Sequence, residues 1–388
     1  MNRIAIVGGK LQGVEAAYLS KKAGLQTVLI DKEENVPARG LVDRFICCDI
    51  LKKESMLIHE LKKVDFVLPA LEDQEALKVL TELSKRYDIK LAFDLDAYSI
   101  SSSKKMSDAL MLENGIPAPR YYPHCKAPYI AKPSFGSGSD GVKYIHTEAE
   151  MEEFLENAPD IENYVIQEFL SGRSYSIEVI GKPGNYKTYE ITELFMDEIY
   201  DCKRVIAPVT ISDKMKSRFS ELAIKLANIL RLEGIMDVEV IEHEGELKVL
   251  EVDARIPSQT PTVVYHASGV NLIEEIRDCI CGRKVKKIPV KTEKKYVSYE
   301  HLLIDSQCIK AQGEHIMSDA NRLELLTHFC GADEVLTDYK LGDRVFRGTF
   351  INVSETKEEL EKKRKMMIEE ICRLQGGKLE FLDSSPLY

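Results

Sequence analysis

The first 95 residues alternate short apolar strands with amphipathic helices, and this alternation limits the possible folds more than any other feature. The predicted strands are Ile4–Val7, Gln26–Ile30, Val64–Leu68 and Lys90–Phe93. A helix is predicted at Asp73–Tyr87. Strand–helix alternation implies a parallel sheet with right-handed crossovers. We therefore expect an α/β protein that opens with a Rossmann-like domain.

Antiparallel strands replace this alternation in the middle of the chain. The serines at 101–103 offer an N-cap for a helix that ends at Asn114-Gly115. Between Pro128 and Asp253 most strands follow one another through turns, and one long helix near residues 215–229 interrupts them. This segment is predicted to be an α+β unit, unlike the opening one.

The end of the chain is expected to form a small α/β domain. It contains a strand near Val345–Val353 and a helix opened by the capping box Thr356-x-x-Glu359. The length of 388 residues suits two or three domains. We expect them at residues 1–95, 96–290 and 291–388, with a mobile lid at about 120–170.

Composition limits the class of partner. The 53 basic and 64 acidic side chains give a net charge of −11, which argues against nucleic acid as a partner and favours small molecules. The longest uncharged stretch, Ile256–Ile273, contains two prolines and is not expected to span a membrane. Nine cysteines without a C-x-x-C pair indicate reduced thiols and a cytoplasmic protein. Whether the protein forms a homodimer is left open by the sequence.

A glycine turn, Gly8-Gly9-Lys10-Leu11-Gln12-Gly13, follows the first predicted strand. A dinucleotide fingerprint needs a glycine where Lys10 stands, so a nicotinamide site is only weakly indicated. The glycines could simply make a strand-to-helix turn, or the turn could bind a small carboxylate at the helix N-terminus. Glu72, after the strand Val64–Leu68, could hold a substrate ammonium group or merely favour the next helix by its charge.

A second glycine-rich segment follows the short strand that carries Lys132. The loop Ser134–Gly141 is rich in N–H and O–H donors that can fold over phosphates, and Lys132 adds a positive charge. A plain hairpin connection is the competing interpretation. The segment Gln167–Leu170 leaves a later strand and could offer backbone groups to an adenine ring.

Acidic and apolar residues alternate on both arms of a predicted hairpin centred on Gly245. Residues two apart share a face of a strand, so Asp237 and Glu239 would face Asp253 and Glu251. Opposed like charges are destabilising unless cations lie between them, and oxygen ligands favour magnesium or manganese. A solvated acidic hairpin is the alternative. The apolar underside is expected to include Leu250.

Taken in order along roughly residues 96–290, these elements resemble the ATP-grasp carboxylate–amine ligases. The helix that carries Lys104 and its exit at 114–119, Lys132 with its loop, and the segment Gln167–Leu170 all resemble elements of that family. The run Glu251–Arg255 resembles its E-x-N-x-R signature, except that Asp253 replaces the asparagine. Ser174 stands where many members carry an acid for the ribose, with Glu178 as a possible substitute.

The resemblance implies a role for each group of residues. Those expected to bind ATP are Lys104, Lys132, Ser137, Gly138, Ser139, Gln167, Glu168, Phe169, Leu170 and Glu178. Those expected to hold Mg²⁺ or Mn²⁺ are Asp237, Glu239, Glu251 and Asp253. Those expected to bind amino-acid substrates are Lys10, Leu11, Gln12, Glu72, Arg255 and Ser258. Arg255 and Lys132 would also act in catalysis.

The implied activity is ATP-dependent amide formation between two amino acids. ATP would convert a carboxylate into an acyl phosphate, which an amine then attacks, while the lid excludes water. Overall resemblance along the whole chain implies 3-methylornithine and lysine as the pair, and another amino-acid or purine-pathway substrate stays open. Two alternatives from other classes are a nicotinamide-dependent oxidoreductase and a non-catalytic nucleotide-binding regulator.

Overall fold

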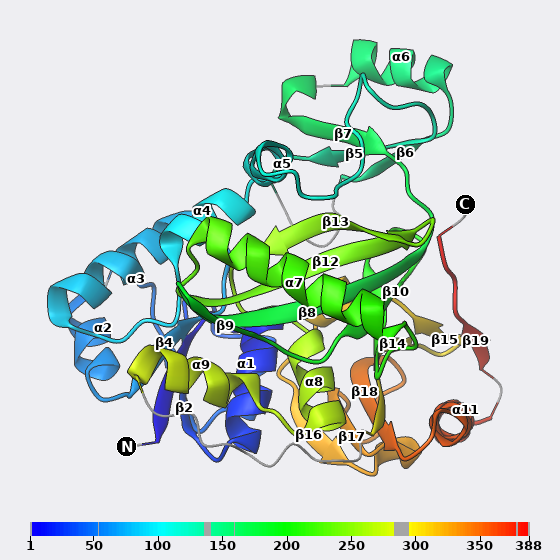
Figure 1. Ribbon diagram of the computed structural model, residues 1–388. Helices are drawn as coiled ribbons and strands as arrows, with labels where there is room; N and C mark the ends of the chain where they lie inside the picture. Colours follow the sequence, from blue (N-terminus) through cyan, green and yellow to red (C-terminus); the bar gives the residue numbers. More distant parts are fainter. Residues whose placement is uncertain are drawn as a thin grey trace.

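Three β-sheets organise the chain, and each has its own place in the computed structural model (Figure 1). The structure describes residues 2–52, 54–135, 141–158, 160–282, 295–377 and 379–386. A parallel sheet lies at the N-terminal side, a small sheet forms an upper lobe, and a large sheet lies between and below them.

The N-terminal sheet has four parallel strands in the order β3-β2-β1-β4. They are β1 (Arg3–Val7), β2 (Gln26–Asp31), β3 (Arg44–Cys47) and β4 (Phe66–Pro69). The helices of this unit are α1 (Leu11–Lys22), α2 (Glu54–Leu61) and α3 (Gln74–Tyr87). The Asp73 side chain caps α3 by accepting from the N–H groups of Glu75 and Ala76. The Rossmann-like opening is confirmed.

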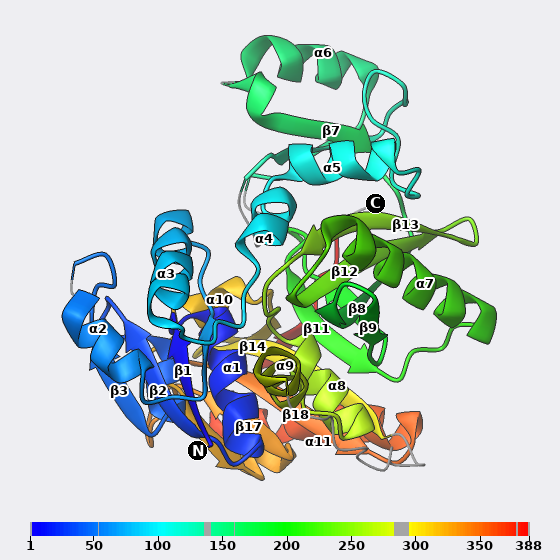
Figure 2. The same ribbon diagram turned by 60° about the vertical axis from the view of Figure 1, so that its left-hand side comes forward.

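A small antiparallel sheet forms the upper lobe, in the order β6-β5-β7. Its strands are β5 (Tyr129–Pro133), β6 (Lys143–Ile145) and β7 (Tyr164–Glu168), and its helix is α6 (Glu148–Asn157). Helices α4 (Leu95–Ser101) and α5 (Lys104–Glu113) lead to it from the N-terminal unit (Figure 2). Because the lobe buries apolar side chains of its own, including Tyr129 and Met151, it has a separate core. Its strands and α6 fall within residues 120–170, the segment predicted to be a mobile lid, and that role stays a prediction.

The large sheet runs β13-β12-β8-β10-β11-β14-β18-β17-β16, with β9, β15 and β19 attached beside this path. Its central strands are β8 (Arg173–Lys182), β9 (Asn185–Thr188), β10 (Thr192–Met196), β11 (Cys202–Ala207), β12 (Gly234–His243) and β13 (Glu246–Asp253). Helix α7 (Asp213–Leu230) covers one face with buried residues such as Phe219 and Leu226.

The C-terminal residues extend this same sheet, because β14 pairs with β11 and places Glu300 opposite Arg204. The strands that follow are β14 (Tyr296–Ile304), β15 (Cys308–Ala311), β16 (Glu324–Thr327), β17 (Glu334–Thr337), β18 (Phe346–Ser354) and β19 (Glu380–Leu382). The helices are α8 (Thr260–Ser268), α9 (Leu272–Cys281), α10 (His315–Ser318) and α11 (Lys357–Leu374). The predicted cap of α11 is present, since Thr356 accepts from the Glu359 N–H.

Two expectations about local structure are wrong, and one strand was missed. Lys90–Phe93 makes only one bridge, between Leu91 and Val67, because Asp94 already caps α4. Strand β3 was not predicted. Helix α6 is a second helix in a segment where only one was expected; its N-cap is Thr147.

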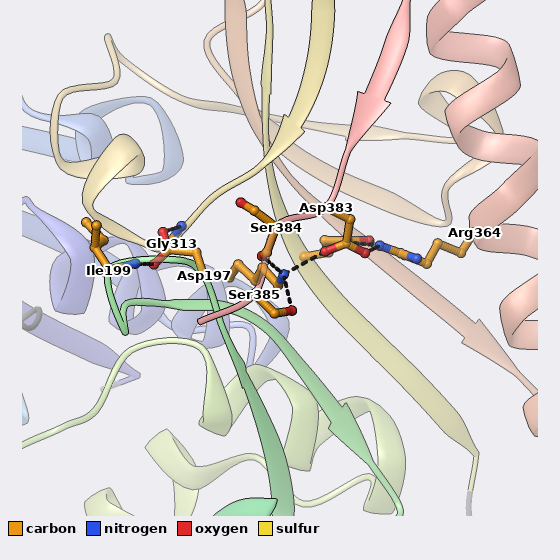
Figure 3. Close-up of polar contacts among 9 residues, drawn as sticks. Asp197, Ile199, Gly313, Arg364, Asp383, Ser384 and Ser385 are labelled. Atoms are coloured by element: carbon orange, nitrogen blue, oxygen red, sulfur yellow. Dashed lines mark hydrogen bonds and ion pairs between the residues drawn. The ribbon is translucent and has the colours of Figure 1, made fainter. Parts of the chain in front are cut away.

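The last described residues return to the large sheet. The ammonium group of Lys203, on β11, lies 2.7 Å from Asp383 and also donates to the Ser384 carbonyl. Arg364 of α11 lies 2.8 Å from the other Asp383 oxygen (Figure 3). These contacts fasten the C-terminal segment beside β11. Within the described ranges, none of the helices combines the length and apolarity needed to cross a membrane.

Candidate active site

Four carboxylates meet on the hairpin of β12 and β13, in the predicted register. Asp237 lies opposite Asp253, and Glu239 lies opposite Glu251. All four side chains line one cavity of about 140 Å³. The alternation of acidic and apolar residues therefore does produce a single acidic face.

One detail of the hairpin prediction is wrong. A β-bulge follows Glu239, so that Val240 faces Val249. Val249 is buried, whereas Leu250, which was expected on the apolar underside, is only half-buried. The extra residue of the bulge displaces Leu250 and leaves the two acidic pairs in place.

The acidic face is electrostatically unfavourable as it stands. Burial raises the pKa of Glu239 to about 8, and the charge of Glu251 adds to this effect. Burial also raises the pKa of Asp253 to about 6, although Arg255 opposes the shift. In the part of the chain that the structure describes, Oδ1 of Asp237 and Oδ1 of Asp253 are buried without a hydrogen-bond partner. A buried all-oxygen set of this kind fits Mg²⁺ or Mn²⁺.

Two lysines from the upper lobe face these acids. Lys104, the first residue of α5, lies 3.4 Å from Glu251. Lys132 on β5 has its pKa lowered by burial, while the nearby charges of Glu251 and Glu239 oppose that shift. Both predicted phosphate lysines thus point toward the acidic face, where the phosphates of a nucleotide would need positive charge.

Part of the predicted ATP site cannot be compared with the structure. Ser137, Gly138 and Ser139 of the glycine-rich loop lie outside the described residues. The segment after β7 is described, and its backbone is less open than expected. The N–H of Glu168 donates to the Arg120 carbonyl at 2.8 Å, and the N–H of Phe169 donates to the Pro128 carbonyl at 2.9 Å.

The side chains of this segment also have defined places. Gln167 is buried and donates to Asp108 at 3.3 Å, and Leu170 is buried as well. The ring of Phe169 packs against Tyr144 at 4.7 Å between centroids. The segment joins the upper lobe to β8, so it has the position of a hinge between the two sheets.

Arg255 connects the acidic face to the N-terminal unit. Its Nη2 lies 2.8 Å from Asp253 and 2.9 Å from Glu72. Glu72 also accepts a hydrogen bond of 3.0 Å from Gln12. Residues predicted from separate motifs to bind substrate therefore form one polar network.

A larger cavity of about 550 Å³ opens on the N-terminal side of this network. Lys10, Leu11, Gln12 and Glu72, the residues predicted to bind substrate there, all line it. It lies at the carboxyl ends of parallel strands, where open α/β sheets bind ligands.

The glycine turn is shaped by packing. A Cβ on Gly8 would lie 2.3 Å from the Ala70 carbonyl oxygen, and one on Gly13 would lie 2.2 Å from the Gly8 carbonyl oxygen. The Gly9 N–H already donates to Asp31 at 2.7 Å. Close packing of strand and helix therefore accounts for these glycines without a dinucleotide.

Two of the predicted residues lie differently from the rest. Glu178 is fully buried on β8 and lines neither cavity, so its assignment to the ribose is not carried into the proposal below. Ser258 lines the smaller cavity, but its hydroxyl donates to the carboxylate of Glu314. Contact between Ser258 and a substrate stays a prediction.

Glu314 is the residue that the sequence did not reveal. Its side chain lines both the smaller acidic cavity and the larger N-terminal one. It belongs to no motif, and its position depends on the pairing of β14 with β11 and β15. A sequence without an alignment carries no signal for it.

Comparison with known proteins agrees with this geometry. The ATP-grasp domain family matches residues 102–259, so the fold and site define an ATP-grasp enzyme, an ATP-dependent carbon–nitrogen ligase. The chain belongs to the family of the 3-methyl-D-ornithine–L-lysine ligases. It is 38% identical over 323 residues to the one from Methanosarcina acetivorans, covering 83% of this chain and 85% of that protein. The corresponding protein of Methanosarcina barkeri is also 38% identical, over 82% of this chain and 84% of that protein.

Solved structures share the fold over nearly the whole length. An N5-carboxyaminoimidazole ribonucleotide synthetase in complex with ADP has a TM-score of 0.69 at 18% identity, covering 96% of this chain and 97% of that chain. An L-amino acid ligase from Bacillus licheniformis has a TM-score of 0.67 at 14% identity, covering 94% and 97%. The resemblance to ATP-grasp ligases is confirmed, and the oxidoreductase alternative is set aside.

Proposed function

We propose that the chain uses ATP and Mg²⁺ or Mn²⁺ to join 3-methyl-D-ornithine to L-lysine through an amide bond. The family to which it belongs supports the substrate pair. The observation that carries the chemistry is the acidic face, where buried carboxylates oppose each other beside two lysines and an arginine. Such a face suits a metal–nucleotide complex better than any other ligand.

Each group of residues has a task in this proposal. Glu239 and Glu251 would hold the metal, which would supply positive charge for the phosphates. Lys104 and Lys132 bind the phosphoryl group during its transfer to the substrate carboxylate. Arg255, held by Asp253 and Glu72, stabilises the oxyanion that forms when the amine attacks the acyl phosphate.

The substrates would occupy the larger cavity. Glu72 and Gln12 lie at its boundary with the acidic face, so they can orient an amino acid with its reacting group toward Arg255. The negative charge of Glu72 suits an ammonium group. The upper lobe, which carries the glycine-rich loop, would cover the nucleotide and exclude water from the acyl phosphate.

The direct test is a turnover assay with purified protein, ATP, Mg²⁺ and both amino acids. Release of ADP should require both amino acids, and mass spectrometry should find their amide. Lys132→Ala should weaken ATP binding, whereas Lys143→Ala, on the exposed side of β6, should not. A nucleotide-binding regulator would instead bind ATP without forming product.

Two finer expectations remain proposals. The nine cysteines form no disulfide in the part of the chain that the structure describes, which agrees with a reducing, cytoplasmic compartment. A homodimer is the second, and sedimentation of the purified chain would test it.

A further inference from the structure

Glu314 lies where the two cavities of the site meet. The larger cavity, which would hold amino acids, and the smaller acidic cavity, which would hold the metal and phosphates, have few side chains in common. Glu314 lines both. An amine that moves from the first cavity to attack an acyl phosphate in the second would therefore pass this carboxylate.

The backbone around Glu314 is fixed from both sides. The Gly313 N–H donates to Asp197 at 2.8 Å, and the His315 N–H donates to Asp201 at 3.0 Å (Figure 3 shows Asp197 and Gly313). His315 also bonds Asp201 through Nδ1 at 2.6 Å. Only glycine fits at 313, since a Cβ there would lie 2.2 Å from an Asp201 oxygen. The turn between β10 and β11 thus holds Glu314 in one position.

The carboxylate of Glu314 is bound on one oxygen only. Its Oε2 accepts from the Ser258 hydroxyl and from Gln259 Nε2, the latter at 3.0 Å. No donor in the described ranges reaches Oε1. The side chain is therefore oriented by its neighbours while one oxygen stays available to a ligand.

The surroundings favour an acceptor of protons. Burial raises the pKa of Glu314, the charge of Asp201 adds to this, and Ser258, Gln259 and Arg255 oppose it. Glu239 faces it from β12 as a further negative charge. A carboxylate in such a place attracts an ammonium group and can take a proton from it.

We propose that Glu314 binds the reacting ammonium group of the amine substrate and removes its proton before amide formation. An ammonium nitrogen has no lone pair, so it cannot attack. Transfer of one proton to Glu314 Oε1 frees the lone pair, which forms the C–N bond at the acyl carbon. The C–O bond to the phosphoryl group then breaks, phosphate leaves with its electron pair, and the second nitrogen proton passes to phosphate or water.

This inference rests on the proposed function, with lysine as the amine substrate. Hydroxylamine separates the two steps, because it is neutral near pH 7 and attacks acyl phosphates without a base. With ATP, Mg²⁺ and 3-methyl-D-ornithine, Glu314→Gln should form the hydroxamate at nearly the wild-type rate. With lysine in place of hydroxylamine, amide formation should fall by about 10²–10⁴-fold, the usual contribution of a general base.

The controls assign each outcome. Asp319→Asn, at the exposed end of α10, should match the wild type in both assays. Equal losses of hydroxamate and amide in Glu314→Gln, or amide formation close to wild type, would overturn the role of Glu314 alone. If the wild type forms neither product, the proposed function fails and this inference with it. Should Glu314→Gln not fold, Glu314→Asp must show the same selective loss with lysine, and equal rates would refute the role.

Discussion

The protein contains two clusters of acidic side chains that lie near each other and differ in how their oxygens are satisfied. On the hairpin of β12 and β13, buried oxygens of Asp237 and Asp253 have no hydrogen-bond partner within the described residues. In the turn between β10 and β11, Asp197 accepts from the N–H groups of Ile199, Asp201 and Gly313. The first cluster therefore has oxygens that can bind a ligand, whereas the oxygens of the second cluster already accept hydrogen bonds from the protein.

The second cluster has the spacing of a metal site, but its hydrogen bonds indicate a structural role. Asp197, Asp201 and His315 could by distance hold a metal ion, but Asp201 already accepts from Cys202 and from two nitrogens of His315. Removing those bonds to admit a metal would leave buried N–H groups unsatisfied. Hydrogen-bond satisfaction, rather than the number of carboxylates, separates a ligand site from a structural clamp.

The largest expected effect is on the hairpin. Glu251→Gln keeps the side-chain shape but removes a charge that the metal needs. Amide formation should fall by more than about 100-fold, since even residues that only support metal ligands cost 10–100-fold. The thermal midpoint without metal or nucleotide should stay equal or rise, because a charge beside Glu239 is lost.

Glu246→Gln is the matched control, since this acid is exposed at the start of the same strand. It should change neither activity nor the magnesium requirement. Full activity of Glu251→Gln at limiting magnesium would show that the acidic face holds no metal. A clear loss of stability would instead indicate a structural salt bridge with Lys104.

In the cluster of Asp197, Asp201 and His315, a substitution should lower stability rather than the magnesium dependence. Asp201→Ala removes the acceptor of the Cys202 and His315 N–H groups, so the free energy of unfolding should fall by about 1–3 kcal/mol. The magnesium dependence of the remaining activity should not change. Chemical denaturation checks the first expectation, with Glu198→Ala, exposed in the same turn, as the control. Equal free energies of unfolding for the two variants would mean that the hydrogen bonds to Asp201 do not stabilise the fold.

Glu15 is intermediate between the two clusters in how its carboxylate oxygens are hydrogen-bonded. One of its oxygens accepts from the Thr262 N–H at 2.6 Å, and the other is buried without a partner in the described part of the chain. Burial raises the pKa of Glu15 from 4.5 to about 8. The folded protein therefore holds a proton that the unfolded chain releases near pH 4.5, and the stability from this group is lost as pH rises toward 8.

Glu15→Gln should remove that pH dependence. Its free energy of unfolding, relative to the wild type, should rise by about 4 kcal/mol between pH 5 and pH 9, as a pKa raised from 4.5 to about 8 implies. Denaturation curves across this range measure the difference, and Glu75→Gln, exposed on α3, should show no trend. A constant difference for Glu15→Gln would mean that this carboxyl stays charged when folded.

Local sequence patterns predicted the hairpin and the helix caps because their causes are local. Alternation fixes which residues share a strand face, so the register of Asp237 with Asp253 followed from the position of Gly245. Side chains such as Ser103 and Thr356 cap helices within three residues of themselves.

The remaining features depend on contacts between distant segments. Leu250 was misplaced because the bulge after Glu239 has no local signature. Glu314 was missed because only the pairing of β14 with β11, and the acceptors Asp197 and Asp201, bring it to the site. Glu178 was predicted as a possible ligand of the ribose, but it is fully buried on β8, where it lies opposite Asp237 of β12.

The smallest expected effect concerns Asp253, which stands at the asparagine position of the E-x-N-x-R signature that Glu251–Arg255 resembles. Asp253→Asn keeps an oxygen for the metal and removes one charge. Arg255 keeps its second partner, Glu72, at 2.9 Å, so its orientation should survive. Burial raises the pKa of Asp253 to about 6, so removing its charge also removes a desolvation penalty. Amide formation should stay within about tenfold of the wild type, a difference of about 1.4 kcal/mol at most.

Magnesium titrations measure this difference. Asp253→Asn should reach half-maximal activity at a lower magnesium concentration than Glu251→Gln does. A loss as large as that of Glu251→Gln would mean that the charge of Asp253 is needed as much as that of Glu251.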